Sequence, residues 1–208
     1  VIQIEKGVKS EINLNGKTVT SGESTLWVSD GYVVTVKDET GEGKIITTSG
    51  SDEAFAIARG GKIILESGNV VGVGYGVYLY SGGATGEEEL VVNGGTIEVP
   101  NGGTAIAIGN GKVTVNNGKV ICNKTPNGEG WNTYVYENGT LEIKGGEFLG
   151  SIGNFGRTSI SGGTFSYPDD PNDGFNDEHL AAGYTTEINA DGSIKVVALP
   201  AAPDGFVW

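Results

Sequence analysis

Short runs in which apolar and polar residues alternate recur along most of the chain. Each unit contains one such run, a turn of about four residues that includes glycine, and a second apolar run. Alternation with a period of two is typical of strands that bury one face, and it differs from the 3.6-residue period of helices. The first runs of the units are Ile12–Leu14, Val34–Val36, Ile63–Leu65, Leu90–Val92, Val113–Val115, Leu141–Ile143 and Thr158–Ile160. The sequence therefore predicts an all-β chain with an internal repeat.

The turns inside these units share one length. In six of the seven units, the second apolar residue lies five positions after the end of the first run, and only the unit at Val36 is longer, through residues 37–43. Glycine takes the third place in turns such as Asn93–Thr96 and Ser161–Thr164, where it allows a positive φ. A chain that turns the same way in each repeat winds into a solenoid.

The repeat spacing favours strands over helices. It averages about 24 residues, whereas helical solenoids have repeats of about 33 or more. We expect a right-handed parallel β-helix of about seven coils, with three strands in each coil. One inward ladder is predicted at Leu14, Val36, Leu65, Val92, Val115, Ile143 and Ile160, and a second at Val19, Ile45, Val70, Ile97, Val120, Phe148 and Phe165. A third strand is predicted around Val28, Ile57, Leu79, Ile108, Val135 and Ile152.

Both ends of such a solenoid need a cap, because its terminal strands otherwise expose unpaired backbone groups. Residues 1–166 are expected to form the β-helix, with Val1–Glu5 closing its start. Residues 167–208 are expected to form a cap or linker segment of the same structural domain. Within it, 176–182 fits a short helix and 185–197 fits a hairpin.

Three motifs carry a resemblance to known proteins. They are Asn93-Gly94-Gly95-Thr96-Ile97, Ser161-Gly162-Gly163-Thr164-Phe165-Ser166 and Leu180-Ala181-Ala182-Gly183-Tyr184. With these motifs, the chain over roughly residues 8–166 resembles the pectate-lyase-like right-handed β-helix superfamily. More narrowly, it resembles the Gly-Gly-Thr-Phe repeat proteins of Gram-positive bacterial surfaces and phage fibres. The resemblance implies an architecture rather than an activity, since the superfamily includes lyases, hydrolases, adhesins and virion parts.

The composition and charge of the chain limit the classes of molecule that it is expected to bind. The chain has 26 acidic and 13 basic residues, and its net charge of −13 disfavours nucleic acid and anionic membranes. No apolar stretch approaches the roughly 20 residues needed to span a bilayer. Cys122 is the single cysteine, which excludes an intrachain disulfide. Abundant glycine and a low charge density favour an extracellular location, and the start at Val1 indicates a processed or excised chain.

Catalytic residues are hard to assemble on the predicted solenoid. The enzymes that the chain resembles place acids, an arginine base or calcium ligands on neighbouring coils, whereas Arg59 and Arg157 are expected about four coils apart. Glu142 faces outward without a second acid beside it, although glycoside hydrolysis requires two carboxyl groups. His179 is expected in the cap and Cys122 in the core. We therefore predict no catalytic residues, with a polysaccharide lyase or glycoside hydrolase as the alternative.

One acidic segment could hold calcium, although no cofactor is otherwise expected. Residues 169–178 are rich in oxygen ligands, but Pro171 and Leu180 occupy ligand positions of the EF-hand template, so that template fails. The weak candidates for an irregular calcium loop are Asp169, Asp170, Asp173 and Asp177.

Aromatic residues are predicted on the outer side of the third strand. One outward column is predicted to contain Trp27, Ala56, Tyr78, Ala107, Tyr134 and Ser151, in which aromatic and small residues alternate. Rings two coils apart then lie about 9.6 Å from each other, near the length of a disaccharide. The candidate binding residues are Trp27, Tyr78, Tyr80, Trp131, Tyr134 and Tyr136. Three interpretations remain open: a glycan platform, an interface with another copy or a neighbouring domain, and strand-forming residues without a partner.

The function predicted from these features is structural or adhesive. We expect a non-catalytic solenoid displayed outside the cell, on a bacterial surface or a phage particle. A glycan or another protein copy is the expected partner, and a homotrimer would be typical of a fibre.

Overall fold

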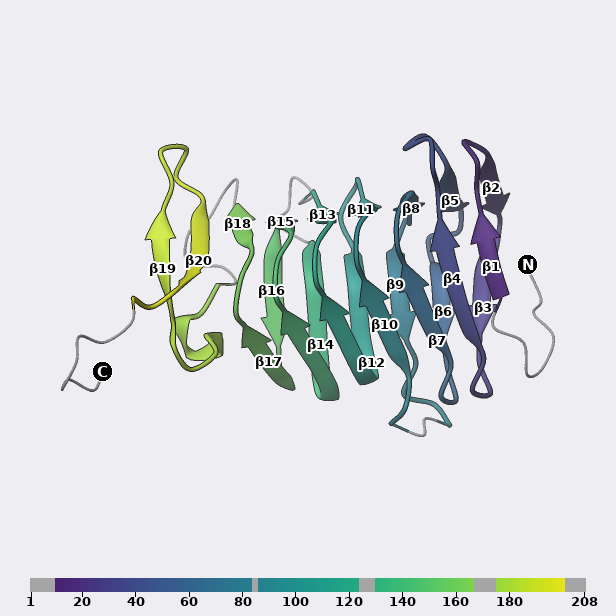
Figure 1. Cartoon of the computed structure of the whole chain (residues 1–208). Coiled ribbons are helices and arrows are strands. Elements are labelled where there is room, and N and C mark those ends of the chain that lie inside the picture. The colour runs from purple at the N-terminus through teal and green to yellow at the C-terminus, as the bar shows by residue number, and fades with distance from the viewer. Residues whose placement is uncertain (1–9, 84–85, 124–129, 167–174, 201–208) are drawn as a thin grey trace.

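The strands of this chain stack in parallel along one axis and form a β-solenoid, seen as a row of arrows in Figure 1. The computed structural model describes residues 10–83, 86–123, 130–166 and 175–200. Hydrogen bonds join the strands into an 11-stranded and a 9-stranded sheet. Among the described residues, no helix is long and apolar enough to cross a membrane. The all-β parallel solenoid predicted from the repeat is confirmed.

The solenoid has three faces. The first face stacks β1 (Ser10–Asn13), β4 (Val33–Lys37), β7 (Lys62–Leu65), β10 (Glu89–Val92), the second halves of β12 (Thr104–Val115) and β14 (Trp131–Ile143), and β17 (Arg157–Ile160). The second face stacks β2 (Thr18–Ser21), β5 (Lys44–Thr47), β8 (Asn69–Val71), β11 (Thr96–Val99), β13 (Lys119–Cys122), β15 (Glu147–Leu149) and β18 (Thr164–Ser166). The third face stacks β3 (Leu26–Val28), β6 (Glu53–Ile57), β9 (Tyr75–Leu79), the first halves of β12 and β14, and β16 (Ser151–Asn154).

The first and third faces belong to one sheet, because β12 and β14 continue around the corner between them. Counted from β3 on the third face, the chain returns at β6, β9, β12, β14 and β16, so it makes about five turns. The expected number of about seven coils also included the end units with β1 and β17.

Aliphatic ladders fill the interior as the alternation predicted. On the second face every expected step is observed, from Val19 opposite Ile45 through to Phe148 opposite Phe165. Phe148 and Phe165 stack with ring centroids 4.9 Å apart. Each fully buried aliphatic or aromatic side chain stabilises the fold by about 1.5 to 3 kcal/mol.

One step of the predicted first ladder has the wrong register. Val36 lies opposite Ile12 rather than opposite Leu14. Leu14 is still buried, but at the corner after β1, where its amide donates to the Lys37 carbonyl oxygen. Alternation fixes which side of a strand is buried, and a shift of two residues preserves that side, so the pattern alone could not exclude the shift.

The long turn after Val36 has a structural role. The buried Asp38 carboxylate accepts hydrogen bonds from the amides of Gly16, at 2.7 Å, and Gly43, at 3.0 Å. It also accepts one from the Thr40 hydroxyl at 2.9 Å. These donors, with the Gly16 amide first, lower the pKa of Asp38 to about 2. Asp38 therefore joins the corners of two successive coils.

The C-terminal segment contains the expected hairpin, but only a three-residue turn in place of the short helix expected over 176–182. Asp177–His179 forms a 3-10 turn, η1, whose N-cap is Asn176. β19 (Tyr184–Ile188) and β20 (Ile194–Ala198) form an antiparallel hairpin, and β20 pairs with β18. The hairpin therefore extends the second face at one end, drawn in yellow in Figure 1. The expected N-terminal cap, Val1–Glu5, lies outside the described residues.

Candidate functional site

Aromatic side chains gather in two groups on the outer side of the third face. The first group, the Trp27 cluster, contains Trp27, Tyr75, Tyr78 and Tyr80. Trp27 and Tyr80 have ring centroids 5.4 Å apart, and Tyr78 and Tyr80 are 4.5 Å apart. Tyr75 stacks on Tyr78 at 5.5 Å. The rings therefore form one continuous surface over β3, β6 and β9.

The second group, the Trp131 cluster, contains Trp131, Tyr134, Tyr136 and Phe155. Trp131 meets Tyr134 edge-on at 5.4 Å. Tyr136 and Phe155 lie 4.7 Å and 5.6 Å from Tyr134, between ring centroids. The structure thus places all six sequence-predicted aromatics in the two clusters, and it adds Tyr75 and Phe155.

Phe155 was missed because the predicted register slipped by two residues. Tyr134 was expected beside Ser151, but it lies opposite Gly153, since β14 and β16 contain an irregularity next to Trp131. Ser151 instead pairs with Trp131 and is buried. Phe155 therefore reaches the end of the aromatic surface, where its side chain is 67% exposed.

The same irregularity corrects the third inward ladder. Ile152 was expected opposite Val135, but it pairs with Thr133, and Val135 pairs with Asn154. Ile152 remains buried. Sequence alternation predicted its burial correctly and its partner incorrectly.

Open gaps were expected on the coils between the rings, and one of the two gaps is closed. Trp27 and Tyr80 touch across β6, where Ala56 and Ala58 are buried. The gap at β12 is open and forms the aromatic groove, with a volume of about 390 Å³. Its lining residues are Tyr78, Ser81, Gly109, Tyr134, Tyr136, Glu137, Asn138 and Phe155. The groove therefore lies between the two clusters and contacts both.

Glycine makes this groove possible. A Cβ atom on Gly109 would lie 2.8 Å from the Leu79 carbonyl oxygen and 3.3 Å from Cε2 of Tyr78. Gly153 has the same relation to Tyr134, whose ring would lie 2.6 Å from a Cβ atom there. Each tyrosine therefore covers the glycine of the next coil, and larger residues would displace the rings.

Two of the tyrosine hydroxyls that line the groove have a raised pKa. Burial raises the pKa of Tyr136, and the nearby Tyr78, Tyr75 and Tyr134 raise it further. Burial is also the main cause that raises the pKa of Tyr78. Tyr78 and Tyr136 therefore present neutral phenols to the groove, each of which can donate and accept a hydrogen bond.

A buried carboxyl group supports the Trp27 cluster from below. Glu53 is 0% exposed and accepts hydrogen bonds from the Ser24 hydroxyl at 2.6 Å and the Tyr80 hydroxyl at 3.0 Å. Burial raises its pKa. Because the bond to Tyr80 fixes a ring that touches both Trp27 and Tyr78, Glu53 is a positioning residue for this cluster.

Two of the residues considered for catalysis form ion pairs, and the two arginines lie far apart. Arg59 pairs with Asp30 at 2.7 Å before β7, whereas Arg157 begins β17, so β7, β10, β12 and β14 separate them. Glu142 pairs with Lys112 at 2.7 Å, and this hydrogen bond lowers its pKa. Its neighbours in register are Thr114 and Ser159, as expected.

The remaining candidates occupy structural positions. His179 contacts the Asn154 amide through Nε2 at 3.3 Å, and burial lowers its pKa. Cys122 is buried, which raises the pKa of its thiol to about 11.

Three of the four candidate calcium ligands lie outside the part of the chain that the structure describes. Within the described ranges, no group of three or more His, Cys, Asp or Glu residues could hold a metal. The candidates Asp169, Asp170 and Asp173 lie outside the described residues, and Asp177 begins η1.

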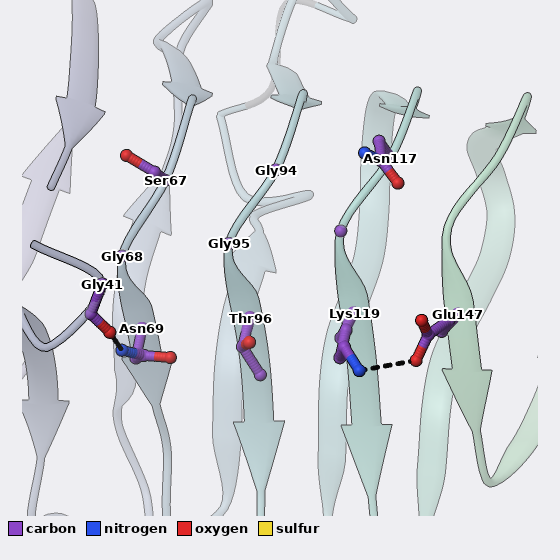
Figure 2. Close-up of a pocket in the computed structure, with 11 residues that line it drawn as sticks. Gly41, Ser67, Gly68, Asn69, Gly94, Gly95, Thr96, Asn117, Lys119 and Glu147 are labelled. Carbon is purple, nitrogen blue, oxygen red and sulfur yellow. Dashed lines mark hydrogen bonds and ion pairs between the residues drawn. The ribbon is translucent and has the colours of Figure 1, made fainter. Parts of the chain in front are cut away.

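A second groove runs along the stacked turns that lead into the second face (Figure 2). It has a volume of about 430 Å³, and Gly68, Gly95 and Gly118 lie along it. At one end Lys119 pairs with Glu147 at 2.7 Å. Its walls are largely the backbone of repeated turns, and the described residues that line it include no aromatic side chain. We therefore take the aromatic groove as the candidate site.

No protein-family model, no curated protein and no solved structure matches the chain.

Proposed function

We propose that this chain is a non-catalytic adhesive module that binds a glycan in the aromatic groove. The observation that carries the proposal is the open groove over Gly109, with Tyr78 on one side and Tyr134 and Tyr136 on the other. The C–H faces of sugar rings stack on aromatic rings, and their hydroxyl groups need polar partners. Ser81 and Asn138 supply such partners at the rim.

The contents of the groove favour binding over hydrolysis. Glycoside hydrolases generally use two carboxyl groups on either side of the scissile bond. Among its described lining residues the groove has one carboxylate, Glu137. The polysaccharide-active enzyme therefore stays the alternative, with release of reducing ends or of unsaturated uronides as its signature.

The location belongs to the same proposal. An acidic, glycine-rich solenoid with aromatic rings on one face suits display outside the cell, on a bacterial surface or a phage particle. A glycan groove on such a module would attach its bearer to a cell wall or capsule.

Binding can be tested with two tyrosine variants and one control. Tyr78→Ala and Tyr136→Ala should each weaken glycan binding about tenfold, since loss of one stacked ring costs about 1 to 1.5 kcal/mol. Ile188→Ala, which alters an 80% exposed side chain on the distant hairpin, should leave binding unchanged. The measurement is retardation in gels that contain a panel of polysaccharides.

Two outcomes would count against the proposal. If glycan retention is intact in both tyrosine variants while the native mass changes, the aromatic surface is an interface between copies. If the wild-type protein releases reducing ends that Glu137→Gln abolishes, the enzyme alternative replaces the adhesive one.

A further inference from the structure

The charge of the aromatic groove limits the class of glycan that it can bind. We infer that it selects a glycan that carries amino groups, such as an unacetylated hexosamine polymer, and rejects uronate chains. This inference rests on the proposed function, because it names the class of glycan that the same groove binds.

The first observation is that the groove holds an anion without a cation. Glu137 is exposed at the rim beside Tyr136, and among the described residues that line the groove none is lysine or arginine. A uronate carboxylate would meet Glu137 and find no ion-pair partner there. An ammonium group would be attracted to it.

The second observation is that Glu137 lacks the ion pair that several exterior carboxylates of the solenoid form. Three strand carboxylates pair with lysines of neighbouring coils: Glu89 with Lys62, Glu142 with Lys112 and Glu147 with Lys119, at 2.6 to 2.7 Å. Glu137, at the corner of β14, has no such ion pair with any described residue. Its charge is therefore left for a ligand.

The third observation is the density of aromatic rings around this carboxylate. Tyr134, Tyr136 and Phe155 are in mutual contact through Tyr134, and all three line the groove with Tyr78. The negative face of an aromatic ring attracts a cation within about 6 Å of its centroid, and the attraction grows where water is excluded. Rings and carboxylate together favour an amine over a neutral acetamide.

The electrostatic field around the groove is negative, like the charge of Glu137. The whole chain carries a net charge of −13. This wider charge attracts any polycation, so the test has to separate the groove from the field.

The experiment compares three short oligosaccharides of matched length by titration calorimetry at physiological salt. They are a glucosamine oligomer, an N-acetylglucosamine oligomer and a galacturonate oligomer. The glucosamine oligomer should bind at least about fivefold more tightly than the acetylated one, on the scale of a cation–π contact. The galacturonate oligomer should bind weakest.

Variants then locate the preference. Glu137→Gln should weaken binding of the glucosamine oligomer more than binding of the acetylated oligomer, which brings the two affinities near equality. Glu42→Gln removes the same charge from an exposed site on another turn, and it should retain the full preference.

The outcomes separate the two proposals. Equal affinity for the amine and acetylated oligomers, or an equal loss of preference in Glu137→Gln and Glu42→Gln, overturns the inference and leaves glycan binding in place. Absence of binding to every glycan tested overturns the proposed function itself.

Discussion

At the scale of single residues, Asp38 shows how one buried carboxylate can organise a coil. Its oxygens accept hydrogen bonds from the amides of Gly16 and Gly43, which lie at the same corner of two successive coils. Such charge-assisted bonds to backbone amides stabilise the ionised form, which is why the pKa falls to about 2. The insertion that interrupts the regular repeat at 37–43 thus contributes a cross-link between coils.

This cross-link predicts a defined dependence of stability on pH. A carboxyl group with a pKa of 3.8 in the unfolded chain and about 2 in the folded chain stabilises the fold above pH 3.8. That contribution is lost as the pH falls through 2. Asp38→Asn should therefore lower the urea midpoint at pH 7, and the difference from wild type should shrink between pH 4 and pH 2.

The control for this prediction is Glu42→Gln, an exposed carboxylate in the same long turn. It should behave like the wild-type protein across this pH range. A gap between wild type and Asp38→Asn that is as wide at pH 2 as at pH 7 would contradict the role assigned to Asp38.

At the scale of elements, the sequence predicted which residues are buried better than it predicted which residues pair across neighbouring strands. Alternation identified the aliphatic residues that face inward on all three faces, because an unpaired polar group inside a solenoid has no water to bind. It missed buried polar residues such as Ser151, which was expected to face outward. It could not fix register at Leu14 or Ile152, since a slip of two residues leaves the buried side unchanged. The same slip hid Phe155. Contacts between rings across β6 depend on side-chain rotamers, which no spacing rule specifies.

Stacked glycine turns are the element that fixes the winding, and they give a second prediction. Gly95 has φ 79°, and a Cβ atom there would lie 2.4 Å from the Gly68 carbonyl oxygen in the turn of the preceding coil. Gly31 has almost the same φ, 76°, but nothing within 4 Å. Gly31→Ala should cost about 1 to 2 kcal/mol for the left-handed backbone.

Gly95→Ala should cost roughly a further 1 to 3 kcal/mol, because the extra methyl group forces two coils apart. Chemical denaturation of the two variants under the same conditions measures the difference directly. Equal losses would mean that backbone conformation alone, and not the contact between coils, selects glycine in these turns.

At the scale of the whole molecule, each coil contacts only its neighbours, so stability is distributed along the axis. The exposed ends are then the weakest points. At one end, β20 pairs with β18 through a hydrogen bond from the Val196 amide to the Gly163 carbonyl oxygen, at 3.0 Å. The buried Val196 side chain packs onto the core there.

This arrangement predicts that a substitution in the C-terminal hairpin destabilises only the neighbouring strands. Val196→Pro removes the amide donor, so amides of β18 and β15 should exchange with solvent much faster, while those of β7 and β10 keep their protection. Val196→Ala loses part of the side chain but keeps the donor, and it should preserve protection in β18. Hydrogen exchange resolved by strand distinguishes the two. Uniform loss of protection in Val196→Pro would show instead that the solenoid unfolds as one cooperative unit. A substitution in the cap would then also destabilise the aromatic groove several coils away.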